Sequence, residues 1–198
     1  MDAKHISPEQ REAEINKYPE YQRKARTMGI PLLGSGAVFE NVGDEMIMEE
    51  TITYLPAHWV KLWGIDFGID HPFAAVLIAW DRDNDVIHIL HAFKMSNAIP
   101  LMHAVPIKHT ARNVPVAWPH DGNNRDKGSG EPLSKLYKAQ GLSMLPEHSH
   151  FPDGSISTEA GILEMLDRMR TGRFKVGKHL AEWFDEFRQY HRKDGQIV

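Results

Sequence analysis

The strongest constraint on the fold is a succession of three apolar runs, Val60–Phe67, Phe73–Trp80 and Val86–Phe93. Each run has the length and composition of a β-strand. The last two are separated by Asp81–Asp85, a short polar turn of the kind that an antiparallel hairpin requires. The sequence therefore predicts a meander of three antiparallel strands.

The segments after the meander alternate between helix and strand patterns. They predict helices over residues 99–111, 132–140, 157–170 and 179–190, and short strands over residues 114–118 and 142–145. A strand, a helix and a further strand in succession imply a parallel pair with a right-handed crossover. The expected fold class is therefore α/β: a mixed sheet of five or more strands, antiparallel first and parallel afterwards, with helices on both faces.

Apolar spacing also predicts a buried face for the helix over residues 157–170. Ile162, Leu163, Leu166 and Met169 are expected to share that face. Gly172 follows as a stop signal.

The residues before the meander have a different character. Ser7–Met28 carries helix signals, with a serine N-cap and a proline at the first helical position. Gly, Pro and Ser are frequent over residues 30–43, which predicts an ordered loop. We therefore expect a helical appendage and connector loop over residues 1–58, followed by one domain over residues 59–198.

Composition limits the classes of protein to which the chain can belong. Its 23 Lys and Arg against 27 Asp and Glu give a net charge of −4, which argues against a uniformly basic nucleic-acid binder but permits a local basic groove. Because there is no cysteine, disulfide frameworks and thiolate zinc sites are excluded. No apolar run approaches the ~20 residues of a membrane span, so we expect an intracellular protein with no membrane partner.

Two acids follow predicted strands that are expected to be neighbours. Asp66 ends the first strand of the meander, between Gly64 and Gly68, and Asp121 lies just past the strand over residues 114–118. Alone, Asp66 is equally explained as a loop acid or cap, and Asp121 is better explained as a turn residue before Gly122. Brought together, two carboxylates repel each other unless one is protonated or a cation lies between them.

Oxygen ligands without thiolates favour Mg²⁺ or Mn²⁺. Two such ions, roughly 3.5–4 Å apart, stabilise the attacking and leaving oxygens of a phosphodiester displacement. The expected reaction class is metal-assisted phosphodiester hydrolysis. Asp70 is a candidate ligand of a second ion or a residue that shapes the turn, and His71 and His120 are candidates for contacts around the metal or with phosphate.

A basic segment follows Asp121 in the sequence. Gly128–Gly130 leaves the backbone accessible, although it lacks the ending of a Walker loop. The segment is equally explained as a DNA-phosphate contact or as a solvated helix face. Its candidate DNA-binding residues are Arg125, Lys127, Lys135 and Lys138.

Several motifs occur in order along the chain: Gly29–Pro31, Gly34–Phe39, Trp63–Gly68, Ala117–Gly122, Asp126–Gly130 and Phe187–Gly195. Together they resemble the C-terminal nuclease domain of the large terminase subunit of tailed double-stranded DNA phages. The resemblance implies a ribonuclease H-like fold. It also implies an endonuclease that cuts concatemeric viral DNA, using two divalent ions held by three acids.

In this resemblance Asp66 matches the first acid and Asp121 the second. The third acid is expected in an Asp-rich stretch that opens a final helix after the Lys193–Gly195 turn, and so beyond Val198. Asp194, within the turn itself, is a poor substitute. The resemblance therefore implies that the sequence up to Val198 lacks the final helix and one metal ligand. It also implies that a domain without this helix and ligand binds metal weakly.

The partners implied by the resemblance are double-stranded DNA, the ATPase motor domain of the same full-length chain, the small terminase subunit and the portal. The isolated domain is expected to be a monomer. It is expected to act in the host cytoplasm during virion assembly and to be absent from the mature virion.

Two alternatives compete with a nuclease. Gly64–Gly68 also resembles the first phosphate loop of the actin, sugar-kinase and Hsp70 superfamily, which shares this strand topology, although that interpretation needs a second lobe and a second phosphate loop. The other alternative is a module without catalytic activity that docks onto a packaging motor or portal.

Overall fold

The computed structural model describes residues 36–39, 41–68, 71–126, 128–193 and 196–197. They belong to two compact units, one over Glu45–Leu180 and one that combines residues up to Asp44 with those from Ala181. The helical segment predicted over residues 7–28 lies outside the described residues. The predicted division at residue 58 stays a prediction.

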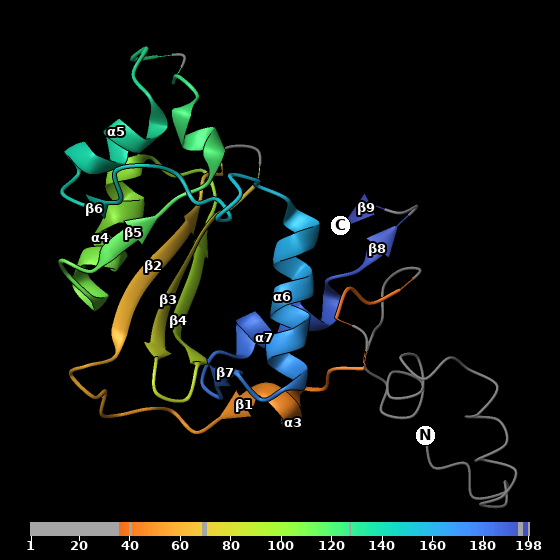
Figure 1. The fold of residues 1–198 in the computed structure, drawn as a ribbon. Helices are drawn as coiled ribbons and strands as arrows, with labels where there is room; N and C mark the ends of the chain where they lie inside the picture. The colour runs from red at the N-terminus through yellow and green to blue at the C-terminus, as the bar shows by residue number, and fades with distance from the viewer. Residues whose placement is uncertain (1–35, 40, 69–70, 127, 194–195, 198) are drawn as a thin grey trace, which may run out of the picture. The chain divides into compact units, whose positions relative to one another are not determined.

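The unit over Glu45–Leu180 contains a seven-stranded mixed sheet with the order β1-β7-β4-β3-β2-β5-β6 (Figure 1). Its strands are Met48–Glu49 (β1), Val60–Asp66 (β2), Phe73–Asp81 (β3), Val86–Met95 (β4), Pro115–Ala117 (β5), Ser143–Met144 (β6) and Phe174–Gly177 (β7). β2, β3 and β4 are antiparallel neighbours, and every other pairing is parallel. The prediction of a mixed sheet that begins with a meander is confirmed.

Helices lie on both faces of this sheet, as predicted, with α4 and α6 on opposite sides (Figure 1). The helices among the residues that the structure describes are Asp44–Ile47 (α3), Pro100–Thr110 (α4), the 3₁₀ turn His120–Asn123 (η1), Leu133–Ala139 (α5), Thr158–Arg170 (α6) and Ala181–Gln189 (α7). No helix among the described residues is long and apolar enough to cross a membrane.

The main core covers the face of the sheet next to α4 and α5. Every second residue along the strands points into this core, as expected for a sheet with one face packed on helices. The buried members of this cluster are Trp63, Ile65, Phe73, Ala75, Leu77, Ala104, Ile107, Val116, Trp118, Tyr137 and Leu142. Burial of Trp63 and Ile65 on this face leaves Asp66, the next residue and the last of β2, pointing away from the core.

The buried face of α6 is narrower than predicted. Its N-cap is Ser157, as the sequence indicates, and Ile162 and Met169 are buried. Leu163, however, is 64% exposed, so its predicted burial is wrong. Leu163 lies about 100° around the helix from Ile162, outside the stripe that Ile162 and Met169 form seven residues apart.

The other unit contains α7, Ala37 to Phe39 and a short antiparallel hairpin of β8 (Arg192–Lys193) and β9 (Gln196–Ile197). The Phe39 ring stacks on Phe187 at 5.5 Å and on Tyr190 at 5.9 Å between centroids. The Val38 amide also donates to the Tyr190 carbonyl at 3.1 Å. Val38 and Phe39 are thus tied to the C-terminal segment within this unit.

Candidate metal centre

Asp66 and Asp121 line one open pocket of about 530 Å³. Their elements are adjacent because β5 pairs with β2 in parallel, with Trp63 opposite Val116 and Gly64 opposite Ala117. Asp66 is the last residue of β2, and Asp121 lies in η1, which follows β5. The full lining consists of Asp66, Pro119, His120, Asp121, Ser149, His150, Phe151, Ile156 and Ser157.

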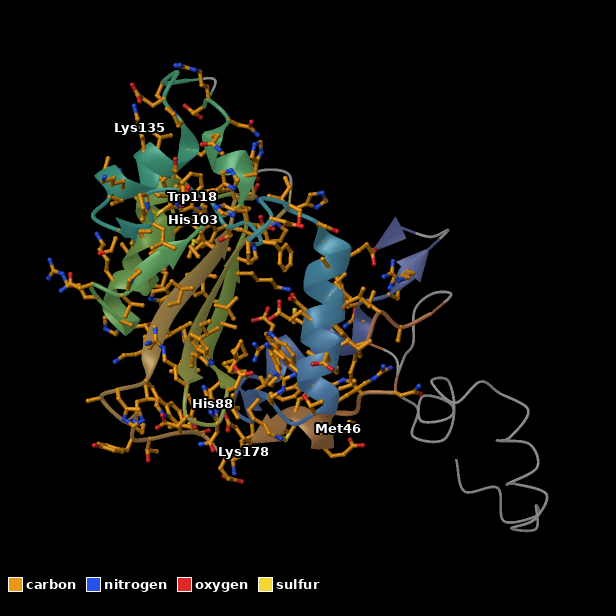
Figure 2. All side chains as sticks on the ribbon, in the orientation of Figure 1. Met46, His88, His103, Trp118, Lys135 and Lys178 are labelled. Atoms are coloured by element: carbon orange, nitrogen blue, oxygen red, sulfur yellow. The ribbon has the colours of Figure 1, made fainter. Side chains whose placement is uncertain are left out.

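Trp118 anchors the segment that presents Asp121. Figure 2 shows this residue at the carboxyl end of β2. Its buried indole donates through Nε1 to the Leu145 carbonyl at 2.9 Å. In η1, the Gly122 amide donates to Pro119 and the Asn124 amide to the carbonyl of Asp121. These bonds hold the backbone of Asp121 in a tight turn above the end of the sheet.

The glycines beside the two acids are required by close packing. A Cβ added at Gly122 would lie 2.4 Å from Cε3 of Trp118 and 2.7 Å from Cε2 of Phe67. At Gly68 it would lie 2.2 Å from the carbonyl oxygen of His71. Real Cβ atoms essentially never lie within 3.0 Å of a non-bonded heavy atom. Only glycine therefore lets the loops after Asp66 and Asp121 pack this closely against His71, Trp118 and Phe67.

The electrostatics of the pocket favour a bound cation. Reduced hydration, followed by repulsion from Asp121, raises the pKa of Asp66, while the Phe67 amide and His71 act in the opposite direction. Oδ1 of Asp121 is buried and has no hydrogen-bond partner among the described residues. An unsatisfied carboxylate oxygen beside a second carboxylate is a donor set that fits a hard divalent cation. Asp66 and Asp121 are the residues that would hold it.

We expect Asp66→Asn to make the metal-free protein more stable at neutral pH. An acid whose folded pKa is raised destabilises the folded state above that pKa, and this penalty vanishes below the unfolded value of about 3.9. The gain should therefore be present at pH 7 and shrink as the pH falls toward 3.5. Urea unfolding at both pH values measures it, and a variant less stable than the parent by the same amount at both would contradict this account.

The structure also shows pocket residues that the sequence did not indicate. Ser149 and His150 come from the loop that follows β6, and Ser157 is the N-cap of α6. Of the two histidines that the sequence did indicate, His120 lines the pocket, and His71 is close enough to lower the pKa of Asp66. Asp70 lies outside the described residues, so its proposed role stays a prediction.

The candidate DNA-binding residues lie outside this lining. Arg125 donates to the Gly130 carbonyl at 2.8 Å, and Lys135 pairs with Glu131 at 3.5 Å, both on the surface. Figure 2 shows Lys135 on the outer side of α5, and Lys138 is exposed on the same helix. Lys127 lies outside the described residues.

A second acidic cluster lies at the opposite end of β3. His58, Asp81 and Asp83 offer ligand atoms within 4.8 Å of one another. The oxygens of Asp81, however, accept hydrogen bonds from the Asp83 amide at 3.1 Å and from Nδ2 of Asn84 at 2.7 Å. These bonds shape the β3–β4 turn, so the cluster is explained by the hairpin.

Comparison with known proteins identifies the family. Residues 63–197 match the family described as the terminase RNaseH-like domain. The chain belongs to this family. It is 44% identical, over 202 aligned residues, to the terminase large subunit of Salmonella phage P22, covering 100% of this chain and 39% of that protein. The chain thus spans about two fifths of this curated relative.

Solved structures agree with the family assignment. The nuclease domain of the P22 large terminase superposes with a TM-score of 0.75 at 42% identity, covering 83% of this chain and 84% of that one. The large terminase nuclease domain of bacteriophage SPP1, solved with bound Mn, gives a TM-score of 0.51 at 18% identity over 79% and 87% of the two chains. The ribonuclease H-like fold predicted from the terminase motifs is confirmed.

Proposed function

We propose that this terminase RNaseH-like domain is a divalent-metal-dependent endodeoxyribonuclease that cuts concatemeric double-stranded DNA during phage genome packaging. The observation that carries the proposal is the convergence of Asp66 and Asp121 on one pocket, where a buried oxygen of Asp121 has no hydrogen-bond partner among the described residues. The similar P22 and SPP1 structures are of nuclease domains, and the SPP1 domain was solved with bound Mn, which supports the proposal.

Each part of the pocket has a role in this proposal. Asp66 and Asp121 would bind Mg²⁺ or Mn²⁺, which when bound activates water and stabilises the charge on the displaced oxygen. Repulsion between the two carboxylates raises the free energy of the metal-free site. Binding of a cation relieves this repulsion and is therefore more favourable. Ser149 and Ser157 also line the pocket, and their hydroxyls are suited to phosphate oxygens. A third acid, expected beyond Val198, would complete the ligand set.

Calorimetry separates this proposal from the kinase-like alternative. We expect Mn²⁺ to bind to the pocket and Mg-ATP not to bind, and tight Mg-ATP binding would favour the phosphate-loop interpretation. Cleavage of supercoiled plasmid in Mn²⁺ tests the nuclease against a docking module without catalytic activity. The assay uses this chain and a version extended past Val198 by its natural sequence. Absence of cleavage by both would contradict the proposal.

We propose that Arg125, Lys127, Lys135 and Lys138 contact the DNA backbone beside the pocket. The combined variant Arg125→Ala, Lys135→Ala, Lys138→Ala should lower duplex affinity for all sequences and reduce the salt slope of log K by up to about 3. Fluorescence anisotropy of a labelled duplex at several salt concentrations measures both quantities.

A matched control removes the same charge from the other end of the unit. Lys61, Arg82 and Lys178 are exposed, and Figure 2 shows Lys178 at the end opposite to Lys135. Their triple alanine variant should keep most of the affinity. Equal losses in the two triple variants would mean that binding reflects net charge alone.

We also propose that the domain works with the other parts of a packaging machine. The chain would act as one part of a large terminase subunit, beside an ATPase motor domain, and with the small subunit and portal, in the host cytoplasm.

A further inference from the structure

A group of three histidines lies at the edge of the carboxylate pocket. The imidazole of His148 is 4.9 Å from that of His120 and 5.8 Å from that of His150, between ring centroids. The interplanar angles are 79° and 76°. His120 and His150 line the pocket itself. Three imidazoles from two segments distant in sequence therefore meet at one place.

Backbone hydrogen bonds fix the tautomers of two of these rings. Nδ1 of His148 lies 3.2 Å from the Ser149 carbonyl, and Nδ1 of His150 lies 2.8 Å from the Phe151 carbonyl. Because a carbonyl oxygen only accepts, Nδ1 carries a proton, and Nε2 is the ring nitrogen that would face a metal ion. Donation from one ring nitrogen to a carbonyl is the arrangement that orients metal-binding histidines.

The loop that carries His148 is held firmly against β5. The Leu145 amide donates to Val116 at 2.9 Å, and the Ser149 amide donates to Trp118 at 2.8 Å. The half-buried His148 ring also packs edge-on against the Trp118 indole, 6.0 Å between centroids. His148 is thus placed by its surroundings before any ligand arrives.

We propose that His120, His148 and His150 bind a transition-metal ion of the Zn²⁺ class, next to the Asp66 and Asp121 site and chemically different from it. Imidazole ligands favour zinc, nickel, copper and iron over magnesium. At Zn–N distances of about 2.0–2.1 Å, the centroids of two tetrahedral imidazole ligands lie roughly 5 Å apart. The 4.9 Å between His148 and His120 matches this separation, and His150, at 5.8 Å from His148, has to move closer. Convergence on one ion requires side-chain rotation of the exposed His120 and His150, and the rotation of His150 gives up its hydrogen bond to the Phe151 carbonyl.

Glu147 is a candidate fourth ligand. Its carboxylate is 3.8 Å from Nε2 of His150. The proposal does not depend on nuclease activity, because it concerns binding alone.

Titration of the metal-free chain with Co²⁺, followed by its visible absorption and by calorimetry, tests the site. We expect a tetrahedral Co²⁺ spectrum that persists in millimolar Mg²⁺ and disappears when Zn²⁺ is added. His148→Ala should weaken Co²⁺ binding by at least about 100-fold. His150→Ala should weaken it as well, and provides a second variant if His148→Ala does not fold.

Two control variants locate the ion. Asp66→Asn with Asp121→Asn should leave the Co²⁺ spectrum in place, and so should His58→Ala, which removes the histidine of the cluster at the β3–β4 turn. Loss of the spectrum in either control, or parent-like binding by both His148→Ala and His150→Ala, would overturn the proposal. An octahedral spectrum abolished by Mg²⁺ would do the same.

Discussion

Asp66→Asn and Asp121→Asn are each expected to reduce DNA cleavage in Mn²⁺ by about 10³-fold or more. Asparagine keeps the size and shape of the side chain but removes the charge that would hold the ion. Losing a group that positions transition-state charge in a shielded pocket costs orders of magnitude in rate. Initial rates of plasmid nicking and linearisation, on the chain extended past Val198, measure the effect.

Asp153→Asn is the matched control for these two variants. Asp153 lies in the loop between β6 and α6, where its carboxylate accepts from the Ser155 amide at 2.9 Å, and it does not line the pocket. Its substitution should leave the rate within a few-fold of the parent. Cleavage by Asp66→Asn and Asp121→Asn as fast as by Asp153→Asn would show that the chemistry lies elsewhere.

Gly122→Ala is expected to have the second-largest effect, on stability and activity together. The new methyl group would meet the rings of Trp118 and Phe67 at less than 3 Å, and Trp118 is buried and hydrogen bonded. Overpacking of this kind typically costs about 1–3 kcal/mol. Relief of the clash requires η1 to move, which displaces Asp121. Urea unfolding and the plasmid assay measure the two consequences.

Gly161→Ala provides the contrast. Gly161 lies within α6, and a Cβ there would have no neighbour within 4 Å. Alanine in a helix interior should stabilise the protein by about 0.5–1 kcal/mol and leave activity unchanged. If both alanine variants behave alike, close packing at Gly122 does not control the position of Asp121.

The meander and the pairing of the two acids could be predicted because local signals agree there. β2, β3 and β4 are long apolar runs, and the Asp81–Asp85 turn joins two of them, so their pairing follows from neighbouring sequence. The strand–helix–strand order after the meander allows the strand over residues 115–117 to lie parallel to β2, and the structure shows that β5 takes this place. The sequence therefore allowed Asp66 and Asp121 to lie close together, and the β2–β5 pairing brings their elements side by side.

Other features depend on contacts between distant residues and left no local signal. β1 and β7 are strands of two and four residues whose pairing is set by the edge at β4. Leu163 is apolar but lies off the packed stripe of α6. His150 lines the pocket because its loop is held beside β5 by backbone hydrogen bonds to the carbonyls of Val116 and Trp118. The need for glycine at position 122 likewise arises from two rings elsewhere in the chain.

The most direct test of the central claim is a crystal structure of the chain soaked in Mn²⁺, with anomalous scattering used to locate the ion. We predict an anomalous peak at the carboxylates of Asp66 and Asp121, the two residues that would hold the ion. A peak only at His58, Asp81 and Asp83, or an ion bound by neither Asp66 nor Asp121, would contradict the assignment of this pocket as the metal centre.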